Sequence, residues 1–171
     1  MMKYNPDRYH RQSIRLSRYD YSKSGAYFIT ICTYEREHIF GDIVDEIMVL
    51  NAFGDFARSH WQQLTQYHPN IIMDESIVMP NHLHGIIFLD ELIENTKSIS
   101  EIIRGFKTFS AKAINKERGL RGVPVWQRNY YDRIIRDELE LARVRQYIIN
   151  NPQNWDTDKN NQNQSSTHTD L

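Results

Sequence analysis

Apolar and polar residues alternate in several short runs of the chain, a pattern typical of strands with one face in a core. The first run is AYFITICTY, directly after Gly25. Two more runs, IIMDESIVM and HLHGIIFL, are separated by Pro80 and Asn81, whose turn chemistry predicts an antiparallel pair. The segment VPVWQRNYYDRIIR, residues 123–136, has the valines, aromatics and isoleucines of a fourth strand and its exit.

Apolar residues recur at helical spacing in three other segments. The first begins at Asn51 and continues to residues 68–70, where the sequence HPN ends the pattern. A second helix is predicted after Ser98, because Ser98 and Glu101 form a capping-box signature ahead of its apolar positions. A third helix is predicted from about Asp137 until Pro152.

The order of these elements predicts an α+β fold. A β-α-β-β-α-β arrangement is the ferredoxin-like pattern, an antiparallel sheet here followed by an additional C-terminal helix. We expect a single domain over residues 1–155, with a basic N-terminal segment at 1–24, because 171 residues are too few for two ordinary domains. Residues 156–171 contain few apolar side chains and are predicted to form a polar, disordered tail.

The composition predicts a soluble protein of the cytoplasm with no membrane contact. The chain is 40% hydrophobic and 25% charged, and no apolar stretch approaches the ~20 residues that span a bilayer. The polar start of the chain predicts no signal peptide. A single cysteine, Cys32, excludes an internal disulfide framework, and its apolar surroundings predict a buried core position.

The formal net charge is −1, but charge is segregated along the chain. Residues 1–24 and 104–145 are rich in arginine and lysine, whereas residues 37–101 are acidic. Two basic blocks that meet in space would form a binding surface for phosphate groups. Solvated helix faces would account for the same charges without any partner.

The stretch IVMPNHLHGIIF places two imidazoles in an apolar run. Residues two apart on a strand share a face, so His82 and His84 project together while Leu83 points to the opposite layer. A buried imidazole must find partners for two polar nitrogens, and a divalent metal would satisfy both side chains. A hydrogen-bonded pair in the core is the alternative interpretation.

The third predicted helix carries a second group of polar side chains. Tyr147 and Asn151 lie four residues apart, which places a hydroxyl and an amide on one helical face. Pro152 disfavours helical geometry at Asn151, so the helix should end there and free the amide to turn toward a ligand. The alternative interpretation is that Asn-Pro is an ordinary helix stop and that the tyrosine serves only in packing.

MPNHLHGII followed by VWQRNYYDRIIRDELELARVRQYIINNPQNW resembles the REP-associated tyrosine transposases, which are single-tyrosine HUH endonucleases of the insertion-sequence-200-like group. HUH denotes histidine, hydrophobic residue, histidine. The resemblance implies that His82 and His84 bind Mg²⁺ or Mn²⁺ and that Asn151 is the third ligand. It implies that Tyr147, on the additional C-terminal helix, is the nucleophile, which attacks single-stranded DNA and leaves a 5′-phosphotyrosine and a free 3′-hydroxyl.

The same resemblance implies single-stranded or hairpin DNA as the partner, and leaves open whether the protein is a monomer or a homodimer. Two groups of cations are candidates for DNA contacts: Arg8, Arg11, Arg15 and Arg18 in the N-terminal segment, and Arg104, Lys107 and Lys112 on the second predicted helix. Tyr130 and Tyr131 are candidates for base stacking and rival candidates for the nucleophile.

Two other classes of function are compatible with these residues. A ferredoxin-like domain can bind nucleic acid on its sheet without any chemistry, and would then need neither histidine nor metal. Alternatively, the two histidines could hold Zn²⁺ in a hydrolase that activates water, with Tyr147 serving only in packing.

Overall fold

A computed structural model of the chain describes residues 25–90 and 97–161. Four strands form one sheet in the order β4-β5-β1-β6, and every neighbouring pair is antiparallel. The strands are β1 (Gly25–Cys32), β4 (Ile71–Met79), β5 (His82–Leu89) and β6 (Tyr131–Ile135). Strand β5 therefore lies between β1 and β4, and this arrangement confirms the predicted ferredoxin-like α+β fold.

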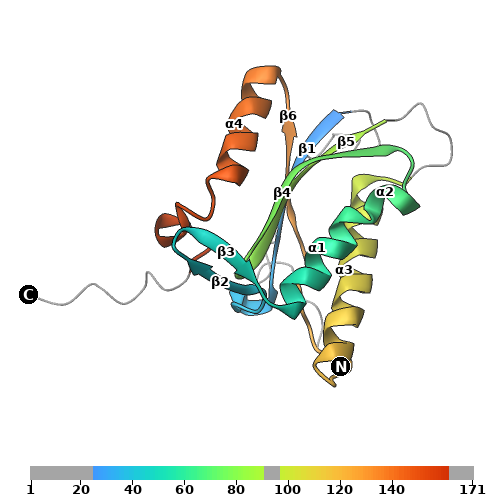
Figure 1. Cartoon of the computed structure of the whole chain (residues 1–171). Helices are drawn as coiled ribbons and strands as arrows, with labels where there is room; N and C mark the ends of the chain where they lie inside the picture. Colours follow the sequence, from blue (N-terminus) through green and yellow to red (C-terminus); the bar gives the residue numbers. More distant parts are fainter. Residues whose placement is uncertain (1–24, 91–96, 162–171) are drawn as a thin grey trace, which may run out of the picture.

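Helices cover both faces of this sheet (Figure 1). Helices α1 (Ala52–Gln62) and α3 (Ile99–Glu117) lie against one face, and the C-terminal helix α4 (Glu138–Ile149) lies against the other. A short helix, α2 (Leu64–Tyr67), follows α1 where the sequence pattern predicted one continuous helix. None of the described helices has the length and apolar character needed to cross a membrane.

The period of two along β1 and β5 divides the buried residues between two cores. Tyr27, Ile29 and Ile31 of β1 belong to the larger cluster with α1 and α3. Ala26 of β1 and Ile86 of β5 belong to the smaller cluster with α4. The candidate site lies on the same side of the sheet as this smaller core, where α4 packs.

Gly85 allows α1 to approach the sheet closely. A Cβ atom at this position would lie 2.3 Å from the Trp61 ring, a distance that no real contact tolerates. Trp61, which is 1% exposed, therefore packs directly on the backbone of β5. This contact supports the strand that carries His84, the residue before Gly85, from the opposite face.

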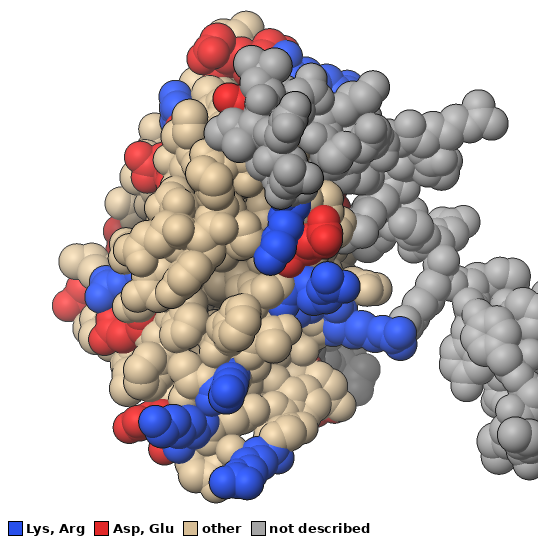
Figure 2. Space-filling model, turned by 90° about the vertical axis from the view of Figure 1, so that its right-hand side faces the viewer, with Lys and Arg blue, Asp and Glu red and all other residues tan. Residues whose placement is uncertain are grey.

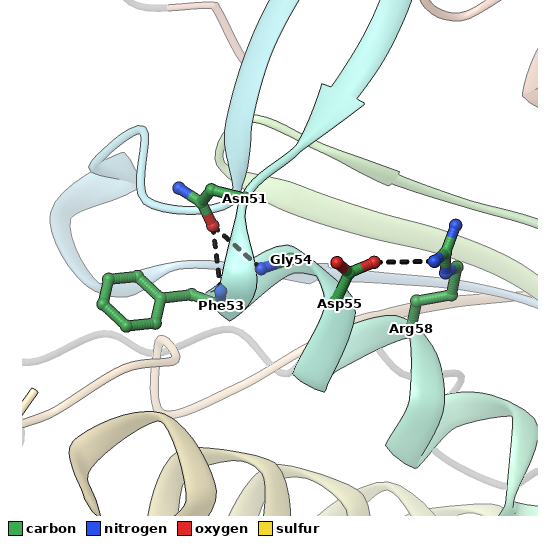
Figure 3. A network of polar contacts seen from close by, with 5 residues as sticks. All are labelled: Asn51, Phe53, Gly54, Asp55 and Arg58. Atoms are coloured by element: carbon green, nitrogen blue, oxygen red, sulfur yellow. Dashed lines mark hydrogen bonds and ion pairs between the residues drawn. The ribbon is translucent and has the colours of Figure 1, made fainter. Parts of the chain in front are cut away.

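Helix α1 begins at a well-formed N-cap (Figure 3). The Asn51 Oδ1 atom accepts hydrogen bonds from the backbone amides of Phe53 and Gly54, at 2.9 and 3.1 Å. An asparagine in this position satisfies amides that have no partner within the helix. One turn later Asp55 and Arg58 form an exposed ion pair. The predicted start of this helix at Asn51 is therefore confirmed.

A hairpin of β2 (Gly41–Val44) and β3 (Ile47–Leu50) precedes α1 and was not predicted. Its two turn residues, Asp45 and Glu46, have φ angles of 50° and 62°. Such left-handed geometry is usually signalled by glycine or asparagine, and neither residue type stands at these two positions.

The end of the described chain differs from the expectation in two respects. Helix α4 stops at Ile149, so Asn151 lies in the turn that follows the helix. The residues after it fold back onto the body: Trp155 begins a short 3-10 turn, and Asp158 and Asn160 are buried. The folded part of the chain therefore extends through residue 161, beyond the predicted tail boundary at 156. The rest of that tail lies outside the described residues.

Candidate active site

The two histidines of β5 lie side by side on the face of the sheet that α4 covers. His82 is 0% and His84 is 1% exposed, and their ring centroids are 4.5 Å apart. Leu83, between them, belongs to the core on the opposite face. The shared orientation predicted from the strand period is therefore confirmed.

A carboxylate from the C-terminal segment completes a cluster with metal-ligand character. One ligand atom each of His82, His84 and Asp158 lie within 4.8 Å of one another, and all three residues are buried. Sequence reasoning missed Asp158, because it lies in a polar segment with no periodic pattern. The only signal nearby was the apolar Trp155, whose burial turns the chain back toward the sheet.

Asn151 joins this cluster from the turn after α4. Its Nδ2 atom donates a 3.0 Å hydrogen bond to Asp158 Oδ2. Its Oδ1 atom and His82 Nε2 are both buried without a hydrogen-bond partner among the described residues. Two such acceptors are costly to bury unless something satisfies them, and one bound cation can accept both lone pairs. The residues therefore fit a divalent metal.

The imidazoles have the protonation state that metal binding requires. Burial lowers the pKa of His82 to about 4, although the Asp158 carboxylate acts in the opposite direction. Burial also lowers the pKa of His84 well below its usual value, and the neighbouring His82 adds to this effect. Both rings are neutral at physiological pH and offer a lone pair.

Tyr147 extends from α4 to the edge of this cluster. Its hydroxyl lies 3.4 Å from His84 Nε2, and its ring packs edge-on against Phe28 at a centroid distance of 6.0 Å. The residue remains 40% exposed, so the side chain borders both the cluster and solvent. Burial raises the pKa of Tyr147 to about 12, and the charge of Asp158 contributes to the shift. The phenol is therefore protonated at neutral pH.

A cleft of about 590 Å³ opens beside Tyr147, between α4 and β6. Its cationic lining residues are Arg36, Arg133, Arg143 and Lys159. Tyr131 lines the same cleft, whereas the Tyr130 hydroxyl lies 3.2 Å from Ser100 Oγ of α3 on the other side of the sheet. Of the two rival tyrosines, the structure brings only Tyr131 near the cluster.

The cations predicted on the second helix fall into two groups. Arg104 and Lys112 are exposed on α3. Lys107 is half-buried, and its ammonium donates hydrogen bonds to the carbonyls of Gln127 and Arg128 at 2.5 and 2.8 Å. Lys107 therefore serves the fold by anchoring the segment that leads into β6. The predicted N-terminal contacts, Arg8, Arg11, Arg15 and Arg18, lie outside the described residues.

Comparison with known proteins shows which family the chain resembles. Residues 21–151 match the family model of the IS200-like transposases. The chain is 37% identical to an uncharacterised protein of Haemophilus influenzae, an alignment that covers 92% of this chain and 96% of that protein. It is 29% identical to a second protein of that organism, whose name carries the words REP-associated tyrosine transposase, over 79% of this chain and 74% of the relative.

A solved structure has a similar fold. It is the structure of a REP-associated tyrosine transposase bound to a REP hairpin, and it superposes with a TM-score of 0.59 at 21% sequence identity. The match covers 82% of this chain and 74% of the other.

Proposed function

The chain belongs to the family of IS200-like transposases, and from this premise we propose that it cuts and rejoins single-stranded DNA beside a hairpin, with Tyr147 as the nucleophile. One observation carries the proposal. The Tyr147 hydroxyl lies 3.4 Å from His84 Nε2, at the edge of the cluster of His82, His84 and Asp158. A nucleophile beside a cation site is an arrangement that favours phosphodiester attack.

The metal proposed for this site is Mg²⁺ or Mn²⁺. His82, His84 and Asp158 would hold it, with the free Oδ1 of Asn151 as a further ligand. The carboxylate and amide oxygens make the donor set harder than two imidazoles alone, which favours these ions. When bound, the ion would polarise phosphate oxygens and offset the negative charge that Asp158 places near the phenol.

The chain's own residues support the remaining steps. Tyr147 Oη would form a bond to phosphorus while the bond to the 3′ oxygen breaks. The proton that the phenol releases is matched by the proton that the departing oxygen gains, leaving a 5′-phosphotyrosine and a 3′-hydroxyl. Attack of a 3′-hydroxyl on the phosphotyrosine reverses the step. Arg36, Arg143 and Lys159 line the cleft and would bind the phosphates on either side.

Hairpin DNA is the proposed substrate class. The relative with a similar fold is bound to a REP hairpin. In this chain, Arg104 and Lys112 would contact stem phosphates, and Tyr131 in the cleft would stack against an unpaired base. Lys107 is left out of this contact because its ammonium is already bonded to backbone carbonyls.

Replacement of Tyr147 by phenylalanine tests the proposal. This change keeps the packing against Phe28 and removes only the attacking oxygen, so cleavage should fall by at least about 10³-fold while the fold and DNA binding remain. The assay is incubation with hairpin-forming single strands from its own genome and Mn²⁺, followed by a denaturing gel for the covalent adduct.

Tyr131→Phe is the matched control, because it removes a hydroxyl from the same cleft. It should retain cleavage and adduct formation. Cleavage without an adduct by Tyr147→Phe would instead indicate a hydrolase that activates water. The absence of metal-dependent cleavage in every version, with DNA binding intact, would indicate a binding module.

A further inference from the structure

Asn81 occupies the turn between β4 and β5, immediately before His82, and is 0% exposed. Its Nδ2 atom donates to the carbonyl oxygens of Arg36 and Asn160, at 3.1 and 2.8 Å. Its Oδ1 atom lies 2.9 Å from His82 Nδ1. Every polar atom of this side chain is therefore engaged, which is what a buried amide requires.

These contacts fix the orientation of the amide. Both partners of Nδ2 are carbonyl oxygens, which can only accept hydrogen bonds. A reversed amide would place Oδ1 against two acceptors, so the amino group must face them. The oxygen then faces His82 and can only accept, so His82 Nδ1 must carry the hydrogen.

A neutral imidazole has one hydrogen on its two nitrogens. If that hydrogen is on Nδ1, then Nε2 bears a lone pair. His82 Nε2 is buried at the cluster of His82, His84 and Asp158 and has no hydrogen-bond partner within residues 25–90 and 97–161. We propose that Asn81 is a positioning residue, which holds His82 in the Nδ1-protonated tautomer and so presents its Nε2 lone pair to the metal site.

The same side chain also positions the opposite wall of the site. The Asn160 carbonyl that accepts from Asn81 lies two residues after Asp158, and the backbone N–H of Asn160 donates a 2.6 Å hydrogen bond to Asp158 Oδ1. The Arg36 side chain binds Asn160 Oδ1 as well. Asn81 therefore connects the strand that carries the histidines to the segment that carries the Asp158 carboxylate. Asn81 and Asn160, the two residues in contact, are 79 positions apart in the sequence.

The tautomer can be measured in the metal-free protein by long-range ¹H–¹⁵N correlation spectra, with the His82 signals assigned from a His82→Gln variant. The parent should show hydrogen on Nδ1 of His82, and Asn81→Leu, which has a similar volume and no acceptor, should lose this preference. Mn²⁺ affinity measured by calorimetry should fall about 10- to 100-fold in Asn81→Leu. Thr30→Val, which removes the partner of His84 Nδ1, is the matched control and should leave the His82 tautomer unchanged.

Asn81→Asp separates the two roles, because its carboxylate can accept from His82 Nδ1 but cannot donate to Arg36 and Asn160. It should keep the tautomer. If His82 of the parent carries its hydrogen on Nε2, the proposal is overturned whether or not the variants fold. The proposal is also overturned if Asn81→Leu keeps both the His82 tautomer and the Mn²⁺ affinity of the parent. The metal role rests on the proposed function, but the tautomer does not. A correct tautomer in a parent that binds no Mn²⁺ would therefore count against the metal site and not against the role of Asn81 in orienting the imidazole.

Discussion

Asp158 brings a negative charge to a cluster whose other polar members are neutral imidazoles and an amide. Its Oδ2 atom accepts from Asn151 Nδ2 and its Oδ1 atom accepts from the backbone N–H of Asn160, so the carboxylate is held in one orientation. A carboxylate that is already held in place strengthens a site for a cation that prefers oxygen ligands, because no further ordering of the side chain is needed on binding. We therefore expect Asp158 to contribute to metal affinity directly.

The variant Asp158→Asn keeps the size of the side chain and removes the charge. Mn²⁺ affinity should fall by about 10- to 100-fold, an effect of the size seen when groups around a metal site are altered. Calorimetric titration measures the change. Asp156→Asn, at an exposed position in the adjacent 3-10 turn, is the control and should bind as the parent does. Equal affinities in the two variants would assign Asp158 to hydrogen bonding alone.

At the residue scale, the sequence predicts the position of side chains that follow the periodicity of a strand or a helix. His82 and His84 could be assigned to one face because side chains alternate along a strand. Asn151 could be proposed from its spacing to Tyr147, although the helix ends before it. Asp158 and Asn81 could not be assigned roles, because their positions depend on how distant segments meet, and no local pattern encodes that contact.

At the scale of elements, the position of α4 decides where Tyr147 lies. Arg145, two residues before it, donates to both carboxylate oxygens of Asp74 on β4, at 2.9 and 2.5 Å. The bond to Arg145 is the main cause that lowers the pKa of Asp74 below its usual value. These two hydrogen bonds connect the helix that carries Tyr147 to the edge strand next to the one that carries the histidines.

The variant Arg145→Gln should have a smaller free energy of unfolding than the parent at neutral pH. Because the pKa of Asp74 is lower in the folded state than in the unfolded state, the contribution of the pair is present above the unfolded value. It is lost as the pH falls through the lowered folded value. Urea unfolding from pH 7 to pH 2 should therefore show the difference between parent and variant disappear in acid.

Arg143→Gln is the control for this comparison, since the Arg143 Nε atom donates to the Leu139 carbonyl of the same helix and so does not connect α4 to another element. It should unfold as the parent does at neutral pH. A difference between parent and Arg145→Gln that persists at pH 2 would show that the guanidinium acts through packing.

The elements themselves were predictable where local signals agreed. The capping box of Ser98 and Glu101 and the N-cap at Asp137 both begin helices where expected. The segment before Tyr131 was predicted as strand from its valines and aromatics, but in the structure Val125 and Trp126 fill the core outside any regular strand. Burial and strand pairing both favour such residues, so composition alone cannot separate them.

At the scale of the whole molecule, a net charge of −1 is compatible with DNA binding because the cations are grouped. One group lines the cleft beside Tyr147 on the α4 side of the sheet. On the opposite face, formed by α1 and α3, Lys and Arg side chains lie in separate groups, and several of these groups have Asp or Glu side chains beside them (Figure 2). Exposed α3 cations on that face are Arg104, Lys112 and Lys116.

This distribution separates two lysines that the sequence could not tell apart. Lys112 is exposed, whereas the Lys107 ammonium is bonded to carbonyls of the segment before β6.

If α3 contacts the stem of a hairpin, Lys112→Ala should weaken binding and reduce the slope of log affinity against log salt by about 0.9, the value for one phosphate contact on duplex DNA. Lys107→Met should leave that slope unchanged and lower the midpoint of thermal unfolding, because the carbonyls lose their donor. Fluorescence anisotropy with a labelled hairpin across a salt series gives the slopes, and calorimetry gives the midpoints. Parental slopes in both variants would place the DNA stem on another face and leave the cleft beside Tyr147 as the main site of phosphate contact.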